Sequence, residues 1–168
     1  DGLYTLTLRD SLYRGREDFV YRVTVGEIPY VTGVYPLGGR VGSRTTVALA
    51  GWNLPLTQAT LDLASVAAGV YPFQACREAN AAPLQVDTLP ERFESEPNDA
   101  ATNALALTLP AVVNGRIGRP GDWDVYRFEG RAGETVVAEV WARRLDSPAD
   151  TLVRLFGPDG RHLAVNDD

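Results

Sequence analysis

Short strand-like segments separated by turns run through most of the chain and constrain its fold most strongly. Residues 3–8 and 19–25 show a period of two in apolar and polar residues, which is typical of β-strands with one buried face. Further strands are expected at residues 30–35, 45–50, 84–86, 112–117, 124–128, 135–143, 151–156 and 162–165. Turns rich in Gly and Pro separate these segments, and one short helix, capped by Asp99, is expected at residues 100–107. The pattern predicts an all-β protein built of β-sandwiches.

The composition removes several classes of catalytic chemistry. All 16 basic residues are Arg, and the chain has one His (His162) and one Cys (Cys76). Without Lys, neither a Schiff base nor a lysine general base can form, and one Cys with one His cannot assemble a zinc site. His162 is the one candidate base for a hydrolytic triad, and no Gly-x-Ser-x-Gly motif offers a nucleophile for it. We therefore expect the chain not to be an enzyme.

Charge and hydropathy also limit the partners. The formal net charge is −6 and no basic run occurs, which argues against a nucleic-acid partner. No stretch reaches the roughly 18 apolar residues that a membrane-spanning helix needs, so we expect no membrane span.

Two changes in composition divide the chain into three parts. Gly26-Glu27-Ile28-Pro29 ends one strand-like segment, and residues 89–99 form a polar, acidic connector. Between them lie about 60 residues, near the small end of what folds alone. We expect a closing β-hairpin in residues 1–27, a compact domain in residues 28–90 and a further domain in residues 91–168.

An ordered series of short motifs runs through residues 91–168. It comprises Glu94-Ser95-Glu96-Pro97-Asn98-Asp99, Asn114-Gly115-Arg116-Ile117, Gly121-Asp122-Trp123-Asp124-Val125-Tyr126-Arg127-Phe128, Gly133-Glu134-Thr135-Val136, Asp150-Thr151-Leu152-Val153-Arg154-Leu155, Gly160-Arg161-His162-Leu163-Ala164 and Asn166-Asp167-Asp168. In this order the series resembles the bacterial pre-peptidase C-terminal domain. The resemblance implies a jelly-roll-type β-sandwich, here incomplete at its C-terminus, that flanks secreted peptidases or belongs to large surface proteins.

The other two parts carry resemblances of their own. Pro29-Tyr30-Val31-Thr32-Gly33-Val34-Tyr35-Pro36 and the Thr45–Leu54 segment resemble the Ig-like IPT/TIG family, which implies an Ig-like β-sandwich in residues 28–90. Residues 1–6 and 21–25 resemble the closing strands of a pre-peptidase C-terminal domain. The chain is therefore interpreted as a slice of a tandem array. Because exposed sheet edges recruit strands, we expect residues 1–26 to pair with the sheet of residues 91–168, within one chain or in a swapped dimer.

Acidic residues in the connector and near residue 123 form the candidate site. In an extended segment, Glu94, Glu96 and Asn98 share one face, and Asp99 follows them. Asp122 and Asp124 make a second pair two residues apart. Such an oxygen-only set suits Ca²⁺ better than Zn²⁺, and the family resemblance points the same way, since calcium-binding members such as the collagen-binding domains of clostridial-type collagenases use acidic residues in these two regions. The alternative is a metal-free connector in which Asp99 caps the short helix and Asn98 orders a turn.

Three functions remain open at this point. The first is a non-catalytic extracellular binding or adhesion module, with Ca²⁺ as a stabilising ion and an unknown protein or polysaccharide as ligand. The second is an accessory domain that aids secretion or substrate contact of a secreted peptidase, and the third is a purely structural spacer. All three place the chain outside the cytoplasm, as an extracellular, cell-surface or periplasmic protein.

Overall fold

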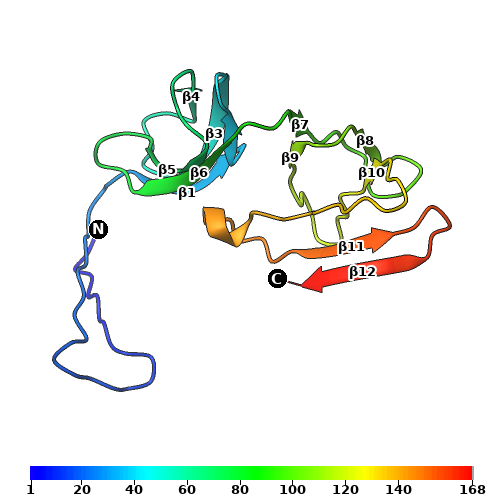
Figure 1. Ribbon diagram of the computed structural model, residues 1–168. Helices are drawn as coiled ribbons and strands as arrows, with labels where there is room; N and C mark the ends of the chain where they lie inside the picture. The colour runs from blue at the N-terminus through cyan, green and yellow to red at the C-terminus, as the bar shows by residue number, and fades with distance from the viewer. Residues whose placement is uncertain (168) are drawn as a thin grey trace.

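The structure is a computed structural model that describes residues 1–167, and it confirms the all-β prediction (Figure 1). Within that part of the chain, the regular elements are twelve strands and one short 3-10 helix, η1 (Arg143–Leu145). Asp168, the last residue of the expected Asn166-Asp167-Asp168 motif, lies outside the described residues. The strands fall into two groups along the chain, one before residue 88 and one after residue 90.

The first group, called here the N-terminal sandwich, contains two three-stranded sheets, ordered β1-β3-β4 and β2-β6-β5. Its strands are β1 (Tyr30–Tyr35), β2 (Gly38–Arg40), β3 (Arg44–Trp52), β4 (Gln58–Asp62), β5 (Gly69–Gln74) and β6 (Ala81–Asp87). Alternate residues of β3 point inward, and Val47 is fully buried. The remaining apolar core comes from both sheets and from the loops after β4 and β5: Val31, Leu49, Leu63, Ala79, Leu84 and Val86. Burial of this apolar set is the main force that holds the two sheets together.

Strand β2 occupies a position where the sequence predicts a turn. Gly38 and Gly39 pair in parallel with Gln85 and Val86 of β6. A Cβ on Gly39 would lie 2.6 Å from both the Leu63 Cδ1 and the Thr45 Oγ1 atoms. The glycines therefore permit a close approach of backbone to core, rather than marking a bend.

The second group, called the C-terminal β region, consists of three two-stranded sheets. Its strands are β7 (Glu91–Phe93), β8 (Leu105–Leu107), β9 (Val112–Asn114), β10 (Tyr126–Phe128), β11 (Leu152–Phe156) and β12 (His162–Asp167). Strands β7 and β9 pair in parallel, as do β8 and β10, while β11 and β12 form an antiparallel hairpin. The parallel pairs bring the connector after β7 close to the loop before β10.

Two expected elements of this region are wrong. Residues 100–107 do not form a helix, because Ala100 and Asn103 close a turn and Leu105–Leu107 pairs with β10 instead. Asp99 is therefore not a helix cap. Residues 135–143 form no strand, and among the described residues they have no partner in any sheet. A strand-like sequence alone does not make a strand, because a strand also needs a neighbour to accept its backbone hydrogen bonds.

The N-terminal arm, residues 1–26, corrects a further prediction. It belongs to none of the sheets, and Figure 1 shows it as a long loop that extends away from the N-terminal sandwich and from β11 and β12. Its backbone hydrogen bonds are local, from Tyr13 to Asp10 and from Phe19 to Arg16, and none joins residues 91–167 in the described chain. Pairing within one chain is therefore wrong. Exchange of the arm between chains stays a prediction.

The described residues contain no helix with the length and apolar character that crossing a membrane requires.

Candidate metal centre

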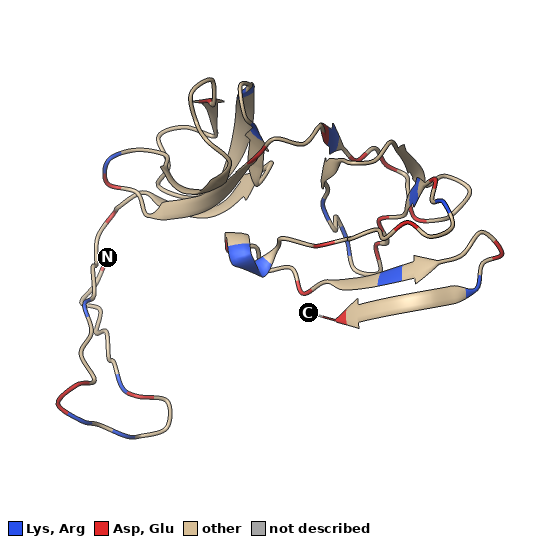
Figure 2. Cartoon of the chain, in the orientation of Figure 1, with Lys and Arg blue, Asp and Glu red and all other residues tan. Residues whose placement is uncertain are grey.

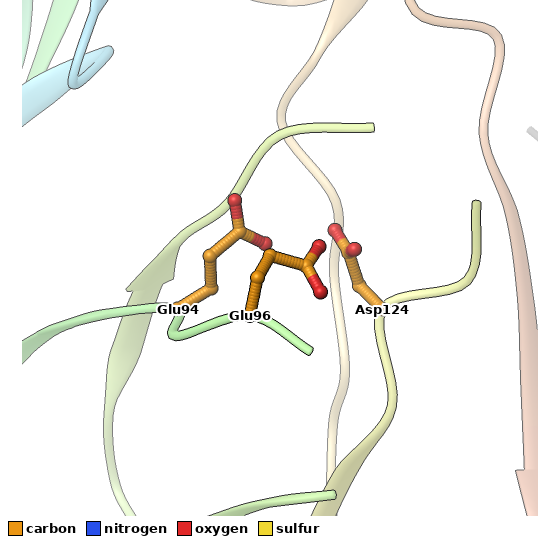
Figure 3. Close-up of side chains that lie close together, drawn as sticks. All are labelled: Glu94, Glu96 and Asp124. Carbon is orange, nitrogen blue, oxygen red and sulfur yellow. The ribbon is translucent and has the colours of Figure 1, made fainter. Parts of the chain in front are cut away.

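Three carboxylates from two separate segments meet at one point of the C-terminal β region. Glu94 follows β7 directly, Glu96 lies two residues further along the connector, and Asp124 lies in the loop before β10. One carboxylate oxygen from each residue lies within 4.8 Å of the other two. Figure 3 shows the three side chains turned toward one another, and Figure 2 shows that acidic residues gather in this part of the fold. The spacing is short enough for one cation to contact all three carboxylates.

Gly115, the residue after β9, leaves the space in which these oxygens meet. A Cβ built on Gly115 would lie 2.8 Å from Glu94 Oε2, 2.8 Å from the Tyr126 hydroxyl and 3.2 Å from Asp124 Oδ2. Any side chain at this position would therefore displace the oxygens. Sequence reasoning missed Gly115 and Tyr126 as parts of the site. A signal was present, because each of them stands in a motif of the ordered series.

Several oxygens at this place are buried and lack a hydrogen-bond partner among the described residues. They include Glu94 Oε2 and Asp124 Oδ1, and both polar side-chain atoms of Asn98 share this state. Asn98 is fully buried, and its backbone links the cluster: its N–H donates to Glu96 Oε2 at 3.0 Å and its carbonyl accepts from Val125 at 3.0 Å. Burying polar atoms without partners costs free energy, and a cation would satisfy the oxygens.

Electrostatics at the cluster indicate a shortage of positive charge. Burial raises the pKa of Glu94 to about 7, and the neighbouring Asp124 carboxylate adds to the rise, although the Arg116 N–H opposes it. The pKa of Asp124 is also raised, first by burial and then by nearby Asp122, Glu96 and Asp99. Burial, with the charges of Asp124, Glu94 and Glu96, likewise raises the pKa of Tyr126. Each shift disfavours the anionic form, and a bound cation would reverse that preference.

Arg119 holds the other two predicted acidic residues. Its Nη2 donates to both carboxylate oxygens of Asp99, at 2.9 and 3.1 Å, and its Nε lies 3.5 Å from Asp122 Oδ1. Asp122 Oδ2 accepts a 2.6 Å hydrogen bond from the N–H of Gly118. Of the six predicted ligands, the structure thus brings Glu94, Glu96 and Asp124 together and places Asn98 beside them, while Asp99 and Asp122 form ion pairs with Arg119.

The two residues considered for catalysis lie in ordinary structural surroundings. His162 is the first residue of β12, and its ring packs edge to face on Phe156 with 5.5 Å between centroids. Cys76 is a half-buried free thiol in the loop after β5.

Comparison with known proteins gives one relative. A stretch of 76 residues is 33% identical to a probable subtilase-type serine protease of Deinococcus radiodurans. The stretch covers 44% of this chain and 10% of that protein. No family model and no solved structure matches the chain. The match is compatible with a pre-peptidase C-terminal domain.

Proposed function

We propose that this chain is a non-catalytic accessory part of a larger secreted protein, a subtilase-type peptidase in the first instance. In this proposal residues 28–90 form an Ig-like domain and residues 91–168 form a β-domain of the pre-peptidase C-terminal type, which a divalent cation stabilises. The observation that carries the proposal is the cluster of Glu94, Glu96 and Asp124 with its buried oxygens that lack partners. The protease relative supports the setting.

The donor atoms favour Ca²⁺ as the cation. Glu94, Glu96 and Asp124 would supply carboxylate oxygens, and the buried amide oxygen of Asn98, which has no hydrogen-bond partner among the described residues, would add another. Ca²⁺ accepts six to eight oxygen ligands at about 2.3–2.6 Å, and carboxylates and amide carbonyls are its usual protein ligands. Zn²⁺ prefers nitrogen and sulfur donors, which this cluster does not contain. The bound ion would neutralise three crowded carboxylates and hold the connector against the loop before β10.

A different feature supports adhesion as a second candidate function. Tyr30 and Trp52 lie directly opposite each other in the β1–β3 ladder, so both rings are on the same face of the sheet. Both are exposed, Trp52 to 71%. Paired exposed aromatic rings can stack on sugar rings or on a protein surface. A Trp52→Ala variant that loses retention on an immobilised polysaccharide would support this function.

Calorimetry and thermal unfolding test the cation proposal. We expect Ca²⁺ to bind the whole chain and to raise its melting temperature, because a ligand at a hundredfold excess over its Kd stabilises the folded state by about 2.7 kcal/mol. Glu96→Gln and Asp124→Asn should remove both effects. Glu129→Gln makes the same charge change at an exposed position outside the cluster and should keep them. Unchanged Ca²⁺ binding by Asp124→Asn would contradict the proposal.

A further inference from the structure

The acidic cluster lies next to the joint between the N-terminal sandwich and the C-terminal β region. Tyr35, the last residue of β1, crosses this joint. Its hydroxyl donates to the carbonyl oxygen of Asn114, at the end of β9, over 3.1 Å. The guanidinium carbon of Arg116 lies 3.7 Å from the centre of the Tyr35 ring, and Phe93 packs on that ring edge to face with 6.3 Å between centroids. Three residues of the C-terminal β region thus hold one side chain of the sandwich.

The same three residues are tied to the cluster through Glu94. Phe93 precedes Glu94 in the chain, and the Glu94 N–H donates to the Asn114 carbonyl at 3.0 Å, so this carbonyl accepts from both Glu94 and Tyr35. The Arg116 N–H donates to Glu94 Oε1 at 2.5 Å. One oxygen of Glu94 therefore positions Arg116, while the other, Oε2, is one of the oxygens around Gly115. A displacement of the Glu94 carboxylate acts directly on the residues that hold Tyr35.

Two other contacts at the joint do not involve the cluster. The connection from β6 to β7 is only three residues long, residues 88–90, and Arg40 Nε donates to the Thr88 carbonyl at 3.1 Å. Helix η1 lies against β6, with Leu145 buried (Figure 1). These contacts keep the two parts adjacent, but they act at the linker and at η1. The Tyr35 contact is the one that continues into the carboxylates.

We propose that cation binding at the cluster locks the joint and sets the orientation of the N-terminal sandwich relative to the C-terminal β region. This inference rests on the proposed cation binding. Without the ion, the carboxylates of Glu94, Glu96 and Asp124 repel one another, which weakens the hold of Glu94 on the Arg116 N–H. With the ion, Glu94 is drawn toward the other two carboxylates and holds Arg116 over Tyr35. The cation thus acts as a switch between a loose and a fixed arrangement of the two parts.

Distance measurements between two spin labels test the lock in the whole chain. The labels are placed at Arg77→Cys and Ala132→Cys in a Cys76→Ser background, since both positions are exposed and lie on opposite sides of the joint. We expect a broad distance distribution in a chelator and a distribution at least twofold narrower in saturating Ca²⁺. The control Arg127→Ala removes an exposed Arg of β10, and Ca²⁺ should narrow its distance distribution as much as in the parent chain.

Variants of the Tyr35 contact distinguish the effect of Ca²⁺ on the joint from Ca²⁺ binding itself. Arg116→Ala keeps the backbone N–H that bonds Glu94, so calorimetry should still detect Ca²⁺ binding. It removes the guanidinium that packs on Tyr35, so Ca²⁺ should no longer narrow the distance distribution between the labels. Tyr35→Phe removes the hydrogen bond to the Asn114 carbonyl, so Ca²⁺ should narrow the distance distribution less than in the parent chain. This variant gives a second test if Arg116→Ala folds poorly. If Ca²⁺ binds to the parent chain but its label-to-label distance distribution does not narrow, the lock is wrong and cation binding stands. The same conclusion follows if the distribution narrows fully in both variants. Absence of Ca²⁺ binding in the parent would overturn both.

Discussion

Asn98 donates its backbone N–H to Glu96 Oε2 at 3.0 Å, while its own fully buried amide side chain has no hydrogen-bond partner among the described residues. The Asn98 backbone thus orients the Glu96 carboxylate. Burying an amide without a hydrogen-bond partner costs free energy, so a bound ion that coordinates its oxygen would stabilise the fold.

Replacing Asn98 with Leu is expected to have opposite effects with and without Ca²⁺. In a chelator, the melting temperature should stay the same or rise, because the substitution removes a buried polar group whose desolvation costs about 1–3 kcal/mol. In saturating Ca²⁺, the gain in melting temperature should shrink, because one oxygen donor is lost. Thermal unfolding in both buffers checks this. A large loss of stability in the chelator would show instead that Asn98 has a structural partner.

Stability without metal is expected to fall as the pH rises toward 8. The folded pKa of Glu94 is about 7, above its ordinary value, so between about pH 4.5 and pH 7 the folded state binds more protons than the unfolded state. The stabilisation from this proton is complete below the unfolded pKa and is lost as the pH rises through the folded pKa. Melting temperatures in a chelator at about pH 6 and about pH 8 measure the effect. Glu94→Gln should flatten this dependence, and an equal slope in that variant would assign it to another group.

Gly115→Ala and Asp99→Asn should differ sharply in their effect on Ca²⁺ affinity. The new methyl group at residue 115 would lie 2.8 Å from Glu94 Oε2, so it should push this oxygen out of the cluster and weaken binding by tenfold or more, on the order of 1.4 kcal/mol. Asp99 is paired with Arg119 and should change affinity by less than about threefold. Isothermal titration of both variants measures this. The reverse order of effects would show that Asp99, as the sequence predicts, is a ligand.

Exchange of the N-terminal arm between chains would make the protein self-associate. The arm exposes apolar side chains at alternate positions, and the two-stranded β11–β12 sheet exposes Leu163 and Val165. Small sheets of this kind can accept an added strand from another chain. Light scattering after size exclusion should therefore give a mass above 18.2 kDa that falls to that of a monomer when residues 1–26 are deleted. A monomeric parent chain at the same concentration would end this prediction.

Much of the fold was determined by local sequence patterns. Residues 45–50 alternate with a period of two and residues 30–35 are rich in strand-forming residues, and β1 and β3 form there because these strands can bury Val31, Val47 and Leu49. The acidic spacing of Glu94, Glu96 and Asp124 likewise pointed to carboxylates that could meet.

Tertiary structure decided the rest, because strands and ligand sites need partners that lie far away in the sequence. Residues 3–8 alternate as well, and residues 135–143 are also rich in strand-forming residues, yet neither forms a strand, since no described neighbour accepts their backbone hydrogen bonds. Arg119 draws Asp99 away from the cluster, and Gly115 opens the space that the remaining oxygens share. A sequence shows which side chains carry charge, but the distance between them is set by pairings such as β7 with β9 and β8 with β10.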